Sequence, residues 1–168
     1  MVAIADRPPA ADWRAVPGHG EGDLLVGRAG RSFIATLVER RSRYLLLARL
    51  GSDRSTARVI GALKQTIGQL PEQLVRSLTG DQDTELAAHQ RLKAETGIDV
   101  YFCDPHSPRQ RGSNENTNGR LRQYLPKGTD LSLKDQQQLD AIAASLNGRP
   151  RQTLDWATPA EKTEEPLR

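Results

Sequence analysis

The chain has 168 residues, a length that suits one domain, and its 36% apolar content is enough for a hydrophobic core, so a wholly disordered chain is excluded. Its single cysteine excludes an internal disulfide framework and a cysteine-based zinc site. No apolar run reaches the roughly 18 residues of a membrane span and no signal peptide is recognisable, so we expect a soluble intracellular protein.

The N-terminal third predicts an arm followed by strands. Residues 1–17 mix proline, alanine and charge without periodicity, which indicates a linker or arm. Three apolar runs separated by turn-forming residues then predict an antiparallel meander of three strands. The expected strands are 22–27, 32–40 and 44–50.

After residue 50 the apolar residues recur at helical spacing, and helices then alternate with short strands. Ser55 or Thr56 can cap the first helix, and Pro71 stops it. Because alternating strands and helices need crossover connections, we expect parallel pairing here. The expected elements are a helix at 55–70, a strand at 75–80, a helix near 84–96 and a strand at 99–104.

Two more helices are expected near the C-terminus. One runs from about Ser113 to Tyr124. The other is signalled by a capping-box pattern at 132–135 and stops at Asn147 and Gly148. The elements together predict an α/β fold, with a five-stranded mixed sheet (antiparallel meander, then parallel strands) flanked by helices.

Three acidic residues stand where a metal-dependent DNA-cutting enzyme needs them. Asp23 and Asp81 lie at apolar strand-like runs, and Glu115 opens a helical segment 34 positions after Asp81. Carboxylates from two strand regions and one helix can hold two hard divalent cations, which take oxygen ligands. Two such ions about 3.5–4 Å apart can activate an attacking oxygen and stabilise a leaving one in phosphoryl chemistry.

Each acid also has a purely structural interpretation. An acid in the first turn of a helix stabilises the dipole by about 0.3–1 kcal/mol, which accounts for Glu115 taken alone. Asn118 and Arg122 share its helix face, however, and that combination suits a metal site that continues into a phosphate track. Asp81 could cap the next helix, although Asp83 or Thr84 is better placed for that role.

Asp23 is expected at the head of the first strand. If the chain is extended there, His19 and Glu21 share its face. Glu21 could then support the site or act as a spare ligand, and a position facing solvent is equally consistent with the sequence.

Basic residues gather around Glu115, although the formal net charge is only +3. A local basic surface beside acidic metal ligands is what a phosphate-backbone substrate requires, and ordinary solvated charge is the competing interpretation. Arg120 and Arg151 belong to the same grouping. The candidate DNA-binding residues are Arg109, Arg111, Asn118, Arg122, Lys127 and Arg149.

Five segments form a specific set: GHGEGDLL, TLVERRSRY, LTGDQDTELAAH, YFCDPHSPRQRGSNENTNGRLRQYLPKGTD and LNGRPRQTLDWATPAE. Together they resemble the catalytic domain of DDE transposases of the IS-thirty insertion-sequence family, over residues 17–161. The chain is more distantly similar to retroviral integrases through Gly112, Glu115 and Asn118.

The resemblance implies a ribonuclease H-like catalytic domain over residues 18–168, with Asp23, Asp81 and Glu115 as the catalytic and metal-binding triad. It implies two Mg²⁺ or Mn²⁺ ions, cleavage of element ends by water, and attack of the new 3′-hydroxyl on target DNA. The implied partners are element-end DNA, target DNA and further copies of the chain, in the bacterial cytoplasm at the nucleoid.

Two departures from the family support a second hypothesis. The chain has no room before Pro17 for the N-terminal helix–turn–helix region of the family. Tryptophan is usual where this chain has Gly20, Gly80 and Arg109, and leucine is usual at Arg120. The alternative to a transposase core is therefore a truncated, non-catalytic remnant that binds DNA or full-length subunits.

Overall fold

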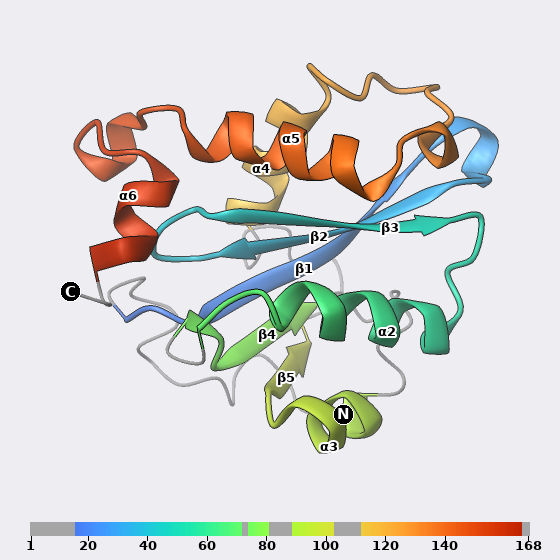
Figure 1. Ribbon diagram of the computed structural model, residues 1–168, viewed down its shortest axis with the longest axis horizontal. Coiled ribbons are helices and arrows are strands. Elements are labelled where there is room, and N and C mark those ends of the chain that lie inside the picture. Colours follow the sequence, from blue (N-terminus) through green and yellow to red (C-terminus); the bar gives the residue numbers. More distant parts are fainter. Residues whose placement is uncertain (1–15, 72–73, 81–88, 103–111, 166–168) are drawn as a thin grey trace.

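The computed structural model describes residues 16–71, 74–80, 89–102 and 112–165. At its centre is a five-stranded sheet with the strand order β3-β2-β1-β4-β5 (Figure 1). Strand β1 pairs antiparallel with β2, and β2 pairs antiparallel with β3, whereas β1–β4 and β4–β5 are parallel pairs. The predicted mixed sheet is confirmed. Its strands are β1 His19–Val26, β2 Phe33–Glu39, β3 Leu45–Gly51, β4 Ser77–Gly80 and β5 Asp99–Phe102.

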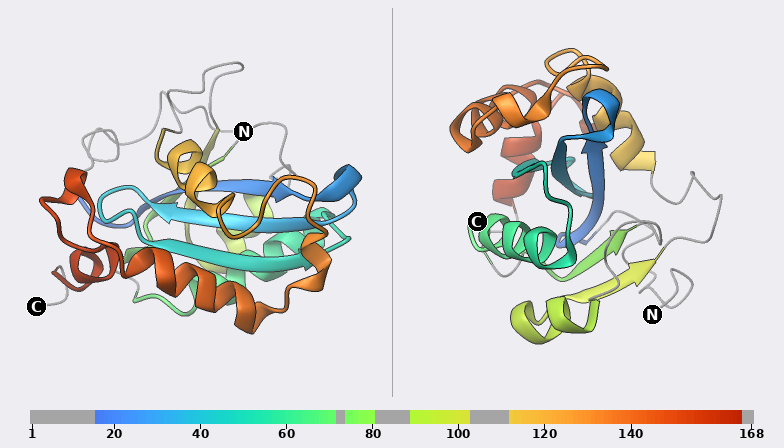
Figure 2. Two further views of the ribbon diagram at one scale, coloured as in Figure 1. Left: turned by 90° about the horizontal axis from the view of Figure 1, so that it is seen from above. Right: turned by 90° about the vertical axis from the view of Figure 1, so that its right-hand side faces the viewer.

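Helices cover both faces of the sheet (Figures 1 and 2). One apolar cluster joins the sheet to α2 on one face, and a second joins it to α4 and α5 on the other. Within the described residues no helix is long and apolar enough to cross a bilayer. The helices are α2 Thr56–Ile67, α3 His89–Thr96, α4 Gly112–Leu121, α5 Gln136–Asn147 and α6 Pro159–Glu164.

Strand β1 alternates small and functional residues between the two faces. A Cβ atom on Gly20 or Gly22 would meet the side chains of Leu37 and Leu78 at 3.0 and 3.1 Å, in the cluster that α2 covers. Because side chains alternate along a strand, Asp23, the residue after Gly22, points to the α4 side, where Asn118 contacts it. The strand begins at His19 rather than at the predicted residue 22, so Asp23 lies within it and not at its head.

Two predicted helix boundaries are corrected. Helix α2 starts at the predicted cap, because Ser55 accepts the Arg58 N–H, but it ends at Ile67 instead of residue 70. Helix α5 is capped by Asp135 and not at Ser132. Gln138 is long enough to reach back to the Asp135 backbone and complete the capping box, a role in which Glu or Gln is favoured. The 3₁₀ turn Leu131–Leu133 contains Ser132.

The remaining predicted bounds differ by a few residues. Strand β4 begins at Ser77, later than the predicted residue 75, and α4 ends at Leu121 instead of Tyr124. Residues 84–88 and 103–104 of the predicted elements lie outside the described residues.

Side-chain amides of α5 cover the edge strand β3. Asn147 accepts the Leu45 N–H at 2.8 Å and donates to the Leu45 carbonyl at 3.0 Å. Near the other end of β3, Gln136 accepts the Arg49 N–H at 2.9 Å and donates to the Leu47 carbonyl at 2.8 Å. These contacts satisfy groups that an edge strand otherwise exposes for pairing with another chain.

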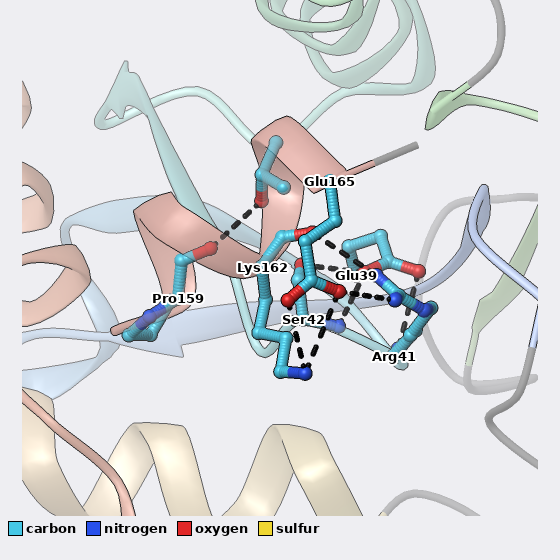
Figure 3. Close-up of polar contacts among 7 residues, drawn as sticks. Glu39, Arg41, Ser42, Pro159, Lys162 and Glu165 are labelled. Atoms are coloured by element: carbon cyan, nitrogen blue, oxygen red, sulfur yellow. Dashed lines mark hydrogen bonds and ion pairs between the residues drawn. The ribbon is translucent and has the colours of Figure 1, made fainter. Parts of the chain in front are cut away.

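Helix α6, which the sequence analysis did not predict, contacts the β2–β3 turn through Arg41 (Figure 3). The Arg41 guanidinium donates to the Lys162 carbonyl at 3.0 Å and to the Glu165 carboxylate at 2.7 Å. The available sequence signal was Thr158 followed by Pro159, since Thr is a favoured N-cap and proline is favoured at the first helical position.

Candidate functional site

Asp23 is held at the interface between the central strand and helix α4. One carboxylate oxygen, Oδ1, accepts the Leu24 N–H at 2.8 Å. The other, Oδ2, accepts a hydrogen bond of 3.1 Å from the side-chain amide of Asn118. Both oxygens of this half-buried carboxylate are therefore oriented by neighbours, one on β1 and one on α4.

The other two predicted triad members are Asp81 and Glu115. Asp81 follows Gly80, the last residue of β4, and lies outside the described residues. Glu115 belongs to α4, three positions before Asn118, and its side chain lies outside the described part. The convergence of the three carboxylates stays a prediction, whereas the contact between the helix of Glu115 and the strand of Asp23 is observed.

Asn118 supplies an oxygen atom beside Asp23 that has no partner within the described structure. Its Oδ1 is buried and accepts no hydrogen bond there. A buried acceptor without a donor is costly unless a ligand satisfies it, and hard divalent cations take amide as well as carboxylate oxygens. The donor set of Asp23 and Asn118 thus fits such a cation. Among the described side chains there is no group of three or more His, Cys, Asp or Glu residues that could hold a metal.

Two polar residues share the Asp23 side of β1, and both are buried. Glu21 is 0% exposed and forms an ion pair of 2.5 Å with Arg40. The Nδ1 atom of His19 lies 2.7 Å from the Ser77 hydroxyl oxygen. The interpretation of Glu21 as a solvent-facing residue is therefore wrong, and its pairing with Arg40 argues for a supporting role over that of a spare ligand.

Sequence reasoning missed Arg40. It follows the last residue of β2, and its backbone N–H donates to the His19 carbonyl, so it lies opposite the start of β1. The available signal was a basic residue at the end of the second apolar strand. The predicted meander pairs this strand with the first strand, next to Glu21.

The predicted DNA-binding residues are only partly described. Arg122 donates to the carbonyls of Val26 and Leu125 at 3.3 Å each, which places it at the end of β1. Lys127 is exposed. The Arg149 guanidinium lies over the Tyr124 ring, 5.4 Å from its centroid. Asn118 contacts Asp23 as described above, and Arg109 and Arg111 lie outside the described residues.

The amino-acid sequence of the chain matches a known protein family. The model of the integrase core domain matches residues 14–108, more than half of the chain. The chain belongs to the integrase core domain family. The predicted resemblance to IS-thirty-type transposases is also confirmed by its relatives.

Bacterial transposases are similar to this integrase core domain over nearly its whole length. It is 53% identical over 161 residues to the transposase for insertion sequence element IS1086 of Cupriavidus metallidurans, covering 96% of this chain and 47% of that relative. It is 50% identical over 158 residues to the transposase InsI for insertion sequence element IS30A of Escherichia coli, covering 94% and 41%. The chain thus spans less than half the length of these relatives.

Solved structures support the ribonuclease H-like fold. A chain of the simian T-cell lymphotropic virus intasome in complex with PP2A regulatory subunit B56 gamma matches with a TM-score of 0.73 and 18% identity, covering 90% of this chain and 56% of that one. The catalytic core domain of BIV integrase matches with a TM-score of 0.65 and 21% identity, covering 89% and 95%. These retroviral cores have the ribonuclease H-like fold, so the predicted fold is confirmed.

Proposed function

We propose that the chain, over residues 18–168, is the catalytic core of a DNA transposase that cleaves element ends and joins them to target DNA. The observation that carries the proposal is the hydrogen bond from Asn118 to Asp23, which brings the helix of Glu115 onto the strand of Asp23. Membership of the integrase core family and the transposase relatives support it. They do not favour the alternative of a non-catalytic remnant.

We propose that Asp23, Asp81 and Glu115 hold two divalent cations, Mg²⁺ or Mn²⁺. When bound, such ions activate the attacking oxygen and stabilise the leaving oxygen of the phosphodiester. The protein would contribute preorganisation: Asn118 and the Leu24 N–H orient the Asp23 carboxylate before any ligand arrives. The buried Oδ1 of Asn118 would offer one further oxygen donor.

The proposed partners are element-end and target DNA, with several copies of the chain assembled on them at the bacterial nucleoid. The exposed Lys127 would bind backbone phosphates. Arg122 would contribute from the end of β1, where it already contacts the Val26 carbonyl. No nucleophilic side chain is required, because water and the new 3′-hydroxyl are the attacking groups.

A strand-transfer assay tests the function. Pre-cleaved element ends are incubated with a plasmid target in Mg²⁺ or Mn²⁺, and joined products are counted. Asp23→Asn and Asp81→Asn should each abolish joining, because an amide is a weaker ligand for a hard cation. Glu164→Gln removes an exposed acid from α6 and should leave joining unchanged. Joining by Asp23→Asn at the wild-type rate contradicts the proposal. An inactive wild type that still binds DNA supports the remnant instead.

A further inference from the structure

Three arginines that the proposed metal site does not use lie where α4 and α5 end. Arg120 is in the last turn of α4, and Arg149 and Arg151 follow α5. Tyr124 links the two segments, because its hydroxyl lies 2.7 Å from the Ser145 hydroxyl and also accepts a hydrogen bond from Arg149. The segments around the three arginines are therefore packed together.

Two of these guanidinium groups contain a buried donor without a partner. The Nε atoms of Arg120 and Arg151 are both buried and make no hydrogen bond within the described structure. Arg151 is only 7% exposed. None of the three arginines forms an ion pair with a described carboxylate, which sets them apart from Arg40, Arg41 and Arg91.

The three positive charges of this cluster repel one another. Burial, with repulsion from Arg120 and Arg149, lowers the pKa of the Arg151 guanidinium. The charged Arg151 guanidinium is thus less favourable in the folded chain than in water, and a bound anion would offset this cost. A buried cation without a counter-charge is strongly destabilising, so an anionic ligand would relieve a cost that the fold otherwise bears.

Two of the arginines are already held in place. Arg151 donates to the Leu146 carbonyl at 3.5 Å, and its backbone carbonyl accepts the Trp156 N–H at 2.8 Å. Arg149 donates to the Gln123 side chain at 3.4 Å and lies over the Tyr124 ring. Preorganised guanidinium groups suit planar, bidentate recognition of phosphate oxygens.

We propose that Arg120, Arg149 and Arg151 form a binding site for a phosphate group of a DNA backbone. The proposal rests on the proposed function, since it assumes that DNA is bound at Asp23. Helix α4 connects the two places: Asn118 contacts Asp23, and Arg120 lies two residues further along. Two residues of an α-helix rise only about 3 Å. Duplex DNA carries one phosphate charge about every 1.7 Å of its axis, so a duplex engaged at Asp23 has phosphates within reach of Arg120.

Salt-dependent DNA binding tests this site apart from catalysis. Binding of a labelled duplex is followed by fluorescence anisotropy over a series of NaCl concentrations, in EDTA so that no metal chemistry occurs. Arg120→Leu and Arg149→Gln should each weaken binding and reduce the slope of log K against log [NaCl] by about 0.9, the loss of one phosphate contact. The double variant should lose little more than either single variant, because both remove the same contact.

Arg91→Leu is the matched control, since it removes an arginine from α3, on the other face of the sheet (Figure 2). Its slope should equal that of the wild type. Arg120→Leu should also raise the melting temperature without DNA, because it removes a guanidinium with a buried, unpaired Nε.

Three outcomes would overturn the proposal. One is wild-type slopes in both arginine variants, and a second is a higher melting temperature of Arg120→Leu with unchanged DNA binding. In the third, inorganic phosphate stabilises the wild type but not Arg120→Leu, while the salt dependence of DNA binding is the same in both proteins. That result would identify a site for free phosphate. A chain that binds DNA as expected but fails to join ends contradicts only the proposed function.

Discussion

The side-chain amide of Asn118 donates a 3.1 Å hydrogen bond to the Asp23 carboxylate, and its own oxygen remains buried without a described partner. One side chain therefore orients the candidate metal ligand and presents another oxygen beside it. Groups that orient a metal ligand typically change metal affinity or activity by about 10–100-fold when they are removed.

We expect Asn118→Ala to lower strand transfer by about 10–100-fold and to raise the Mg²⁺ concentration needed for half-maximal activity. Titrating Mg²⁺ at fixed DNA concentration measures both effects. Asn116→Ala is the control, because Asn116 is an exposed asparagine on the same helix. An Asn118→Ala variant with an unchanged Mg²⁺ requirement would show that Asn118 only joins α4 to β1.

The buried pair of Glu21 and Arg40 predicts a large effect on stability. Arg40→Leu removes the guanidinium 2.5 Å from a carboxylate that is 0% exposed. Breaking a buried ion pair from one side typically costs about 3–5 kcal/mol of unfolding free energy. Urea denaturation measures this loss. The double variant Glu21→Leu with Arg40→Leu should be more stable than Arg40→Leu alone, and an equally unstable double variant contradicts the explanation.

The antiparallel meander and the parallel half of the sheet were predictable from local patterns, whereas the strand order β3-β2-β1-β4-β5 was not predicted. Apolar runs with intervening turns indicated the meander, and helical spacing after residue 50 indicated the parallel half. Asn118 was placed on the face of Glu115 by helix periodicity, and the structure shows that it reaches Asp23. In these cases the local pattern and the tertiary packing favour the same conformation.

The partners of individual polar residues were not predictable in the same way. Glu21 is buried in β1 because Arg40, which follows the neighbouring strand β2, forms an ion pair with it. Their separation of 19 positions leaves no periodic signal in the sequence. The N-cap of α5 shows a related limit. Capping-box patterns beginning at Ser132 and at Asp135 both fit the sequence, and the structure uses the second, which the side chain of Gln138 completes. Asp81 and the side chain of Glu115 remain predictions.

The contact of Asn147 with the edge strand predicts a second loss of stability. Asn147→Ala removes one acceptor and one donor from the buried backbone groups of Leu45. An unsatisfied buried group costs about 1–3 kcal/mol, so the unfolding free energy should fall by at least about 2 kcal/mol. Thermal unfolding checks this, with Gln137→Ala on the exposed side of α5 as the control. Equal melting temperatures for the two variants would mean that water replaces the amide.

The packing of α6 against the β2–β3 turn should weaken at acidic pH, because Glu165 becomes protonated. Hydrogen bonds from Arg41 and then Lys162 lower the pKa of the Glu165 carboxyl group. A depressed pKa stabilises the folded form above the unfolded pKa, and this contribution is lost as the pH falls through the folded value. Amide exchange in Pro159–Glu164 should therefore accelerate at acidic pH relative to α5, which provides an internal control. In Glu165→Gln, exchange should be faster at neutral pH and lose this acid dependence. A variant with the wild-type pH profile would assign the acid response to another group.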